Sequence, residues 1–180
     1  MIKKVCLGVV DNELGRLAQG LPNKITGTST INFIFKHEIP FGKKVTYANM
    51  VCDYRPLKEE TFRVRLTIGG DKLEYLEETS SPAANLLETK LLLNSVISDK
   101  ESRFNSMDIK DFFLQSSLKQ KEYMRIHSKY FSQNFRDLYK LHDRINKDGY
   151  VYCEIVKVIY ELKQAAILAY KQFKENLMKG

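Results

Sequence analysis

The stretch TFRVRLTIGGD, residues 61–71, alternates apolar and polar side chains. One side of the alternation carries Phe62, Val64, Leu66 and Ile68, and the other carries Arg63, Arg65 and Thr67. A period of two predicts a β-strand with one buried face, and the Gly69–Gly70 pair that follows predicts a turn. Two arginines on the outer face are typical of a solvated edge, with a phosphate contact as the alternative.

Further strands are predicted on both sides of this stretch. Residues 29–40 and 43–54 each alternate, and the short connection between them predicts that they pair as a hairpin. Residues 122–127 and 150–158 show the same alternation closer to the C-terminus. The chain therefore contains several half-buried strands.

Helices are predicted among these strands. Residues 80–98 carry many leucines around most of the helix circumference, so we expect a well-buried helix that is capped near Ser80 or Ser81. Residues 133–145 predict a short helix, and residues 160–179 predict an amphipathic one. This mixture of strands and helices defines the fold class α+β.

Composition limits the classes of function. The formal net charge of the 180 residues is +7, which favours polyanionic partners, although a soluble protein that is merely basic has the same balance. Cys6, Cys52 and Cys153 are widely spaced and odd in number, which argues against a disulfide framework or a zinc site. No apolar stretch reaches membrane-spanning length. We expect an intracellular, cytoplasmic protein that makes no membrane contact.

An acidic residue interrupts the stretch NSMDIKDFFLQ, residues 105–115. Asp108 falls inside a predicted strand at 103–109, and a turn or short helix is predicted at 111–118. A carboxylate in a buried strand requires a compensating partner. By itself the pattern favours a hydrogen bond or an arginine as that partner, and a hard divalent cation such as Mg²⁺ is the alternative.

Several blocks of the chain resemble copia-type retrotransposon reverse transcriptases. SMDIKDFFLQSSL, followed by EYMRI, is similar to the first catalytic block of that family, and VYCEIVKVIYELKQA resembles a later block whose core reads Tyr-Gly-Leu-Lys-Gln-Ala. The segments at 44–58, 63–75 and 80–98 also resemble the family and occur in the expected order. The resemblance extends from about residue 12 to residue 180.

This resemblance implies an RNA-directed DNA polymerase with a right-hand fold. Residues 1–100 would form a fingers-like region, and residues 101–180 would form the first half of the palm. The implied partners are an RNA or DNA template–primer and deoxynucleoside triphosphates, and the implied cofactor is Mg²⁺. The implied location is a retrotransposon particle in the cytoplasm.

The resemblance also implies roles at individual positions. Asp108 would be the first metal-binding aspartate and thus the catalytic residue, and Ile109 would offer its backbone carbonyl to the same metal. The residues that would bind the nucleotide are Phe113 beneath the sugar, Gln164 at the start of the last helix, and Arg65, or with less support Arg63, at the triphosphate. Asp111 would lie near the triphosphate, although a turn or a helix cap explains it equally well.

Two departures from the family pattern affect these implications. The family supplies further catalytic carboxylates in a Tyr-x-Asp-Asp hairpin, and the 180 residues contain no adjacent Asp pair. We therefore expect a fragment that is inactive by itself, with a non-catalytic nucleic-acid-binding remnant as the alternative. Glu161 and Val158 stand where the family commonly has Gly, and an acid at 161 is expected to repel a triphosphate unless it points outward.

Overall fold

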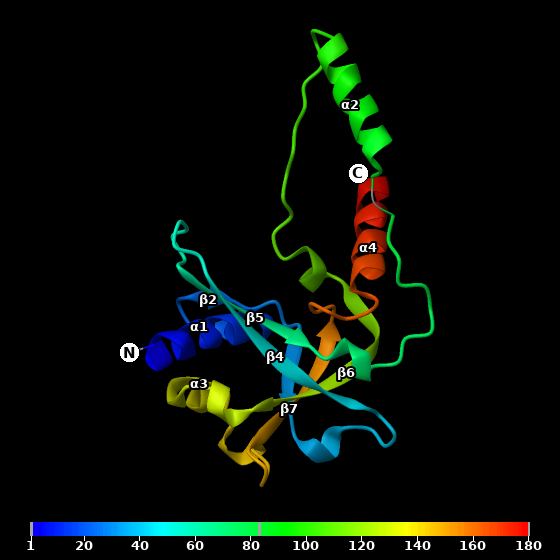
Figure 1. The fold of residues 1–180 in the computed structure, drawn as a ribbon. Helices are drawn as coiled ribbons and strands as arrows, with labels where there is room; N and C mark the ends of the chain where they lie inside the picture. The colour runs from blue at the N-terminus through cyan, green and yellow to red at the C-terminus, as the bar shows by residue number, and fades with distance from the viewer. Residues whose placement is uncertain (1, 83, 180) are drawn as a thin grey trace.

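The computed structural model describes residues 2–82 and 84–179, and it is an α+β protein with a mixed sheet (Figure 1). The five strands lie in the spatial order β3 (Ile31–Ile34), β7 (Tyr150–Lys157), β6 (Ser117–His127), β4 (Val45–Tyr54) and β5 (Phe62–Ile68). Two short strands, β1 (Gly20–Leu21) and β2 (Ile25–Thr26), form a separate ladder. The 3₁₀ turns are η1 (Lys36–Glu38), η2 (Gly70–Lys72), η3 (Phe112–Gln115), η4 (Ser128–Tyr130) and η5 (His142–Arg144).

The strands predicted at 29–40 and 43–54 exist, but the prediction that they form a hairpin is wrong. β3 pairs with β7, with Ile31 opposite Ile155. β4 pairs antiparallel with β5 and parallel with β6. β3 carries the fully buried Ile31, and its neighbour β7 is among the most buried strands of the sheet, so the long-range pairing buries more apolar surface than a local hairpin would.

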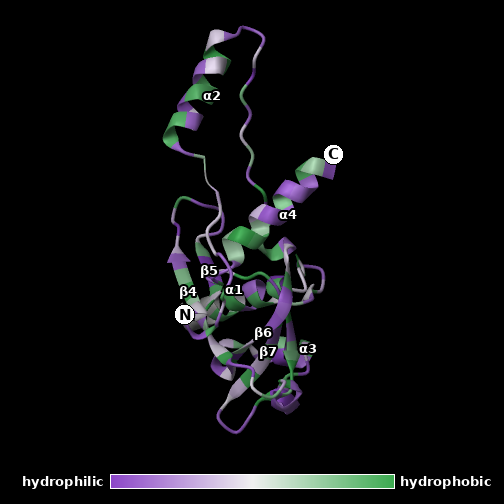
Figure 2. Ribbon diagram, turned by 90° about the vertical axis from the view of Figure 1, so that its right-hand side faces the viewer, coloured by the Kyte–Doolittle hydropathy of each residue, from purple (hydrophilic) through white to green (hydrophobic). Residues whose placement is uncertain are grey.

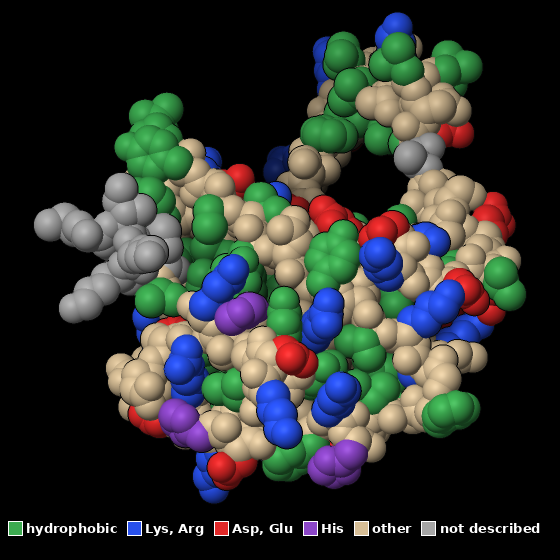
Figure 3. Space-filling model, turned by 60° about the horizontal axis from the view of Figure 1, so that its bottom comes forward, with side chains coloured by type: hydrophobic (Ala, Val, Ile, Leu, Met, Phe, Trp, Pro, Cys, Tyr) green, Lys and Arg blue, Asp and Glu red, His purple; other side chains and the backbone are tan. Residues whose placement is uncertain are grey.

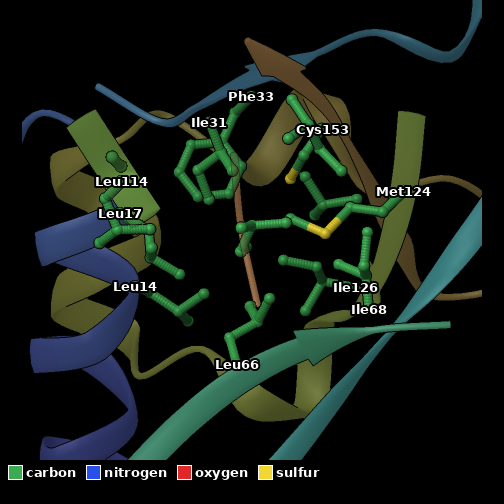
Figure 4. Packing of buried hydrophobic residues seen from close by; sticks show 14 of the residues in the cluster. Leu14, Leu17, Ile31, Phe33, Leu66, Ile68, Leu114, Met124, Ile126 and Cys153 are labelled. Atoms are coloured by element: carbon green, nitrogen blue, oxygen red, sulfur yellow. The ribbon is translucent and has the colours of Figure 1, made fainter. Parts of the chain in front are cut away.

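Helix α1 (Ile2–Leu17) was not predicted from the sequence. Its buried side chains Val10, Leu14 and Leu17 recur at helical spacing and pack on one face of the sheet. Figure 4 shows Leu14 and Leu17 pointing toward Ile31, Leu66 and the other labelled core residues. Helix α1 therefore covers the face of the sheet that forms the core.

The inward side chains of the central strands complete this core. Met124 and Ile126 of β6 and Cys153 of β7 are essentially inaccessible to solvent (Figure 4). Helix α3 (Gln133–Leu138) adds Phe135, whose ring meets Phe33 edge to face with centroids 5.9 Å apart. The predicted helix at 133–145 is divided into α3 and η5, because Lys140 between them adopts a positive φ of 51°.

The predicted helix at 80–98 is confirmed as α2 (Leu86–Ser98), with Asn85 and not a serine as its cap. The Asn85 side chain accepts a hydrogen bond from the Glu88 backbone N–H at 2.9 Å, and the Glu88 carboxylate accepts one from the Asn85 N–H at 3.0 Å. The prediction that this helix is buried is wrong, since Leu86 and Leu91 are 69% and 60% exposed.

Helix α2 belongs to an extended arm, which comprises residues 74–82 and 84–107. Both connections of the helix run away from the sheet and carry α2 beyond the remainder of the molecule, which we call the body (Figures 1 and 2). The predicted strand at 103–109 is wrong: this segment is irregular, Asp108 is exposed and Met107 is 78% exposed. A strand needs a neighbour with which to form hydrogen bonds, and the arm leaves the sheet before β6 begins.

The last predicted helix is confirmed as α4 (Ala165–Lys179), although it begins five residues later than predicted. Ala165 and Ala169 are buried, whereas Phe173 and Leu177 are 38% and 66% exposed, so the packing of the helix on the body ends near Phe173. No helix within the described ranges combines the length and apolar character needed to cross a membrane. In the five-stranded sheet, the two strands from residues 101–180 lie between strands from residues 1–100, and the division of the chain at residue 100 stays a prediction.

Candidate functional site

A cavity of about 540 Å³ lies between α1, the start of β5 and the segment that leads from the arm into β6. Its lining includes four of the residues singled out from the sequence, namely Asp108, Ile109, Asp111 and Phe113. The other lining residues that bear on the chemistry are Glu13, Arg16, Glu60, Arg63, Lys110 and Tyr160. The cavity therefore collects charged and aromatic groups from distant parts of the chain.

Asp111 is held by an arginine of α1. An N–H of Arg16 donates to the Asp111 carboxylate, and the same guanidinium donates to Glu13 at 2.7 and 3.1 Å. Glu13 is 6% exposed and accepts a further hydrogen bond from the Leu66 N–H at 3.1 Å, which connects α1 to β5. Asp111 thus has the arginine partner that the sequence pattern suggested for Asp108.

The ion pairs change the electrostatics of this wall of the cavity. Burial lowers the pKa of Arg16, but the pairing with Glu13 outweighs burial and raises that pKa above its ordinary value. Arg16 is therefore a permanent cation whose charge is already shared by two carboxylates. Among the lining residues, three cations (Arg16, Arg63 and Lys110) face four carboxylates (Glu13, Glu60, Asp108 and Asp111). The formal balance is one negative charge, so an anionic ligand requires additional positive charge.

An aromatic row forms one side of the cavity. The half-buried ring of Phe113 lies 5.5 Å from Phe112 and 6.1 Å from Tyr160, centroid to centroid, with an edge-to-face arrangement in both pairs. Phe112 in turn meets Phe173 of α4 at 5.9 Å. These contacts fix the Phe113 ring at the cavity wall, where a flat apolar surface is available to a ligand.

Two of the predicted nucleotide-binding residues lie elsewhere. Arg65 is exposed and outside the cavity lining, whereas Arg63, the alternative from the same strand, is part of the lining. Gln164 is 5% exposed and borders a different cavity of about 250 Å³, together with Glu122 and Leu168. The structure therefore brings Arg63, and neither Arg65 nor Gln164, next to Asp108.

The available oxygen ligands do not fit a two-metal centre. Asp108 is exposed and can offer a carboxylate beside the carbonyl of Ile109, but the Asp111 carboxylate is already paired with Arg16. Within residues 2–82 and 84–179 no group of three His, Cys, Asp or Glu side chains is arranged to hold a metal ion. The described residues therefore supply part of one coordination shell, and a complete site needs carboxylates from outside this set.

Glu161 occupies a backbone conformation that favours glycine. Its φ is +70°, and its carbonyl oxygen lies so close to Gly70 that a Cβ at Gly70 would be 2.2 Å from it. Its neighbour Tyr160 lines the 540 Å³ cavity, but Glu161 borders a separate hollow with Asp71 and Lys163. Position 161 is one of the two, with Val158, at which the sequence pattern of the resembled family commonly has Gly.

Glu13 and Arg16 were missed by the sequence analysis. The signal for them is a helical pattern in which Val10, Leu14 and Leu17 share one face and a Glu–Arg pair with i,i+3 spacing lies beside it. Arg16 and Asp111 are 95 residues apart, and no local pattern predicts that they meet.

Comparisons with known proteins gave no match for this chain. Neither family profiles, nor the sequences of curated proteins, nor solved structures showed a significant similarity.

Proposed function

We propose that this chain is the fingers and first half of the palm of a copia-type reverse transcriptase, and that the 540 Å³ cavity is its nucleotide site. The observation that carries the proposal is the convergence of Asp108, Ile109, Asp111 and Phe113 with Arg63 around one cavity. The cavity residues provide a carboxylate and a carbonyl for a metal, an aromatic wall for a sugar and a guanidinium for phosphate oxygens.

The backbone at Glu161 supports the same proposal independently. The resemblance aligns this residue with a glycine, and its positive φ is the conformation for which glycine is the default residue. A chance match of sequence blocks has no reason to place a glycine position on a left-handed residue. The positive φ at this aligned glycine position therefore supports the proposal, even though the side chain differs.

In this proposal the chain binds a nucleotide and requires further carboxylates for chemistry. The cavity carries one formal negative charge, so a triphosphate would bind together with Mg²⁺, which Asp108 and the Ile109 carbonyl would hold in part. Because the oxygen ligands within the described residues are too few for two metals, we expect binding without nucleotidyl transfer. A nucleic-acid-binding remnant without a nucleotide site is the second candidate.

The test is binding of a fluorescent deoxynucleoside triphosphate, measured by anisotropy with and without Mg²⁺. We expect Mg²⁺-dependent binding that Asp108→Asn and Arg63→Gln each weaken about tenfold or more, because a charge-assisted contact contributes roughly 1.5–3 kcal/mol. Arg65→Gln is the matched control, since it removes the same charge two residues along the same strand but outside the cavity. Asp71→Asn is the control for the exposed carboxylate.

Primer extension distinguishes the candidates. Extension that Asp108→Asn abolishes would show an active polymerase and contradict the expectation that this chain lacks part of the site. Salt-sensitive primer–template binding without Mg²⁺-dependent nucleotide binding would support the remnant. Equal losses of nucleotide affinity in Arg63→Gln and Arg65→Gln would show that the cavity is not the nucleotide site. Absence of both nucleotide binding and primer–template binding at low salt would refute both candidates.

A further inference from the structure

A second surface with distinctive chemistry lies on the face of the sheet that points away from the core. Met124 and Ile126 of β6 point inward, so Arg125 and His127 point outward. On β7, Tyr152 lies opposite Arg125 and Tyr150 lies opposite His127. The two central strands therefore place Arg125, His127 and Tyr150 side by side on the outer face, and Tyr152 beside them is 6% exposed, so it contributes to packing more than to the accessible surface.

Cations lie over the aromatic rings on and around this face. Arg125 lies 4.7 Å from the ring centre of Tyr150, and the Lys129 ammonium lies 5.1 Å from that of Tyr130. The members of this basic–aromatic face are the cations Lys36, Arg125, Lys129 and Arg144 and their partners Tyr152, Tyr150, Tyr130 and Phe35. About two cation–π contacts are usual in a chain of this length, so four contacts at one end of the sheet are a local concentration.

The charge of the surface is unbalanced. Figure 3 shows Lys, Arg and His side chains gathered on this end of the molecule. Acids lie among them as well: Glu154 is bound by Lys121 at 2.9 Å, Glu38 accepts from the Phe35 N–H at 2.6 Å, and the exposed Asp143 and Asp148 lie close to Arg144 and Tyr150 in the sequence. Within the described residues, none of these acids forms an ion pair with Lys36, Arg125 or Lys129. The exposed cations Lys36, Arg125 and Lys129 therefore remain available to an external anion.

We infer that the basic–aromatic face binds single-stranded nucleic acid. Such strands are held by cations that contact phosphates and by aromatic rings on which bases stack, and this face offers both. Tyr150, Tyr130 and Phe35 are half-buried, so their packing fixes the rings while part of each stays accessible. An unstacked strand fits this chemistry better than a duplex, because the bases of a duplex do not expose their faces for stacking.

This face is separate from the candidate nucleotide site. The segment 108–113 precedes the start of β6 at Ser117, whereas Arg125 and His127 are at the other end of that strand. At the usual rise per residue, the two ends of β6 are roughly 30 Å apart. The inference therefore does not depend on the proposed polymerase function, and its test uses different variants.

The test measures binding of a fluorescein-labelled oligothymidylate of about 15 nucleotides, a length that suits sheet-based single-strand sites. The double variant Arg125→Gln/Lys129→Gln is compared with Lys90→Gln/Lys174→Gln, which removes the same charge from exposed positions in α2 and α4. If both cations contact phosphates, we expect the slope of log K against log salt to flatten by about 1.4 in the first variant and hardly at all in the second.

Stacking is tested with Tyr150→Leu, which we expect to weaken binding about tenfold. Should this variant fail to fold, the charge variants still decide the question. Photo-crosslinking to a 4-thiouridine oligomer is expected to label residues 125–130 and 150–152. Three results would overturn the inference: equal losses in the two double variants, crosslinks confined to 108–113, or no binding at low salt. Arg125- and Lys129-dependent binding to phosphatidylserine vesicles but not to the oligomer would overturn it in favour of a membrane surface.

Discussion

Apolar residues at regular spacing are buried in helix α1 of the body but exposed in helix α2 of the arm. In α1, Leu14 and Leu17 are completely buried against the sheet. In α2, which is richer in leucine, every leucine is exposed, and Leu92 is 56% exposed. The sequences of the two helices do not predict this difference. It depends on whether the connections bring the helix onto the sheet.

The comparison teaches that a helix pattern specifies a helix but not the surface that it contacts. Asn85 and Glu88 form a capping box, so α2 is well defined locally. Its leucines lie all around the helix, a distribution typical of helices with neighbours on several sides. The sequence of the arm thus specifies a helix, but no other described part of the chain covers that helix. In the body, the helix α1 is both formed and packed against the sheet.

The largest expected difference between the arm and the body is in the rate of proteolysis. Lys100 and Arg103 lie in the exposed, irregular part of the arm, where no sheet hydrogen bonds protect the backbone. We expect trypsin to cut there about a hundredfold or more faster than in the body, because local opening costs little free energy in the arm. Mass spectrometry of early fragments would identify the first cut, and Lys100→Gln/Arg103→Gln should delay it. A first cut within α1 or β6 would break the comparison.

The next largest difference is expected in the effect of side-chain truncation on the free energy of unfolding. Leu66 of β5 is fully buried, so Leu66→Ala is expected to lower the free energy of unfolding by about 2–5 kcal/mol. Leu92→Ala in α2 is the matched change and should stay within about 0.5 kcal/mol. Both changes in the free energy of unfolding would be measured by urea denaturation. A large decrease in the free energy of unfolding of Leu92→Ala would show that the arm is packed in solution.

Alkaline pH should destabilise the body through Cys153. Burial raises the pKa of this thiol well above its ordinary value, so the folded state keeps the proton. The unfolded thiol loses its proton above about pH 8.5, and stability that is present below this pH should then fall by up to about 1.4 kcal/mol per pH unit. Denaturation at several pH values would measure the slope. Cys153→Val should flatten it.

The smallest expected effect concerns the strained backbone of the body at Glu161. Its φ of +70° disfavours any residue with a Cβ, so Glu161→Gly is expected to raise the free energy of unfolding by about 0.5–1 kcal/mol. Glu161→Ala removes the charge but keeps the strain, and it should show no such gain in the same denaturation experiment. A higher free energy of unfolding in both variants would show that the effect comes from removal of the carboxylate and not from relief of backbone strain.

The sequence predicted the elements of this fold better than their partners. The alternation in β5 and β7 predicted strands that the structure confirms, although both strands also bury residues of the second face, such as Thr67 and Tyr152. The partner of β3 could not be predicted, since local turn residues favour the nearest strand and β7 lies far away in the chain. The strand expected at 103–109 failed for a related reason: Met107 and Ile109 alternate correctly, but no strand is available to pair with them.

The candidate site could be predicted only where its residues are close in sequence. Asp108, Ile109, Asp111 and Phe113 form one short segment, and the structure places all four at the cavity. The choice between Arg63 and Arg65 depends on the twist and approach of β5, which the alternation does not specify. Arg16 comes from a helix that the sequence analysis did not recognise.

The position of β7 in the sheet has a consequence for how the chain is made. β7 lies between β3 and β6, so β3, the first strand of the five-stranded sheet, cannot pair until β7, the last one, has been synthesised. At ordinary rates of translation this interval is about 6–25 seconds. During that time the backbone of Ile31–Ile34 has no β7 partner on the nascent chain, although helix α1 is already available to cover Ile31. The β4–β5 hairpin can form early, whereas β3 should gain its backbone protection in one late step after β7 has been synthesised.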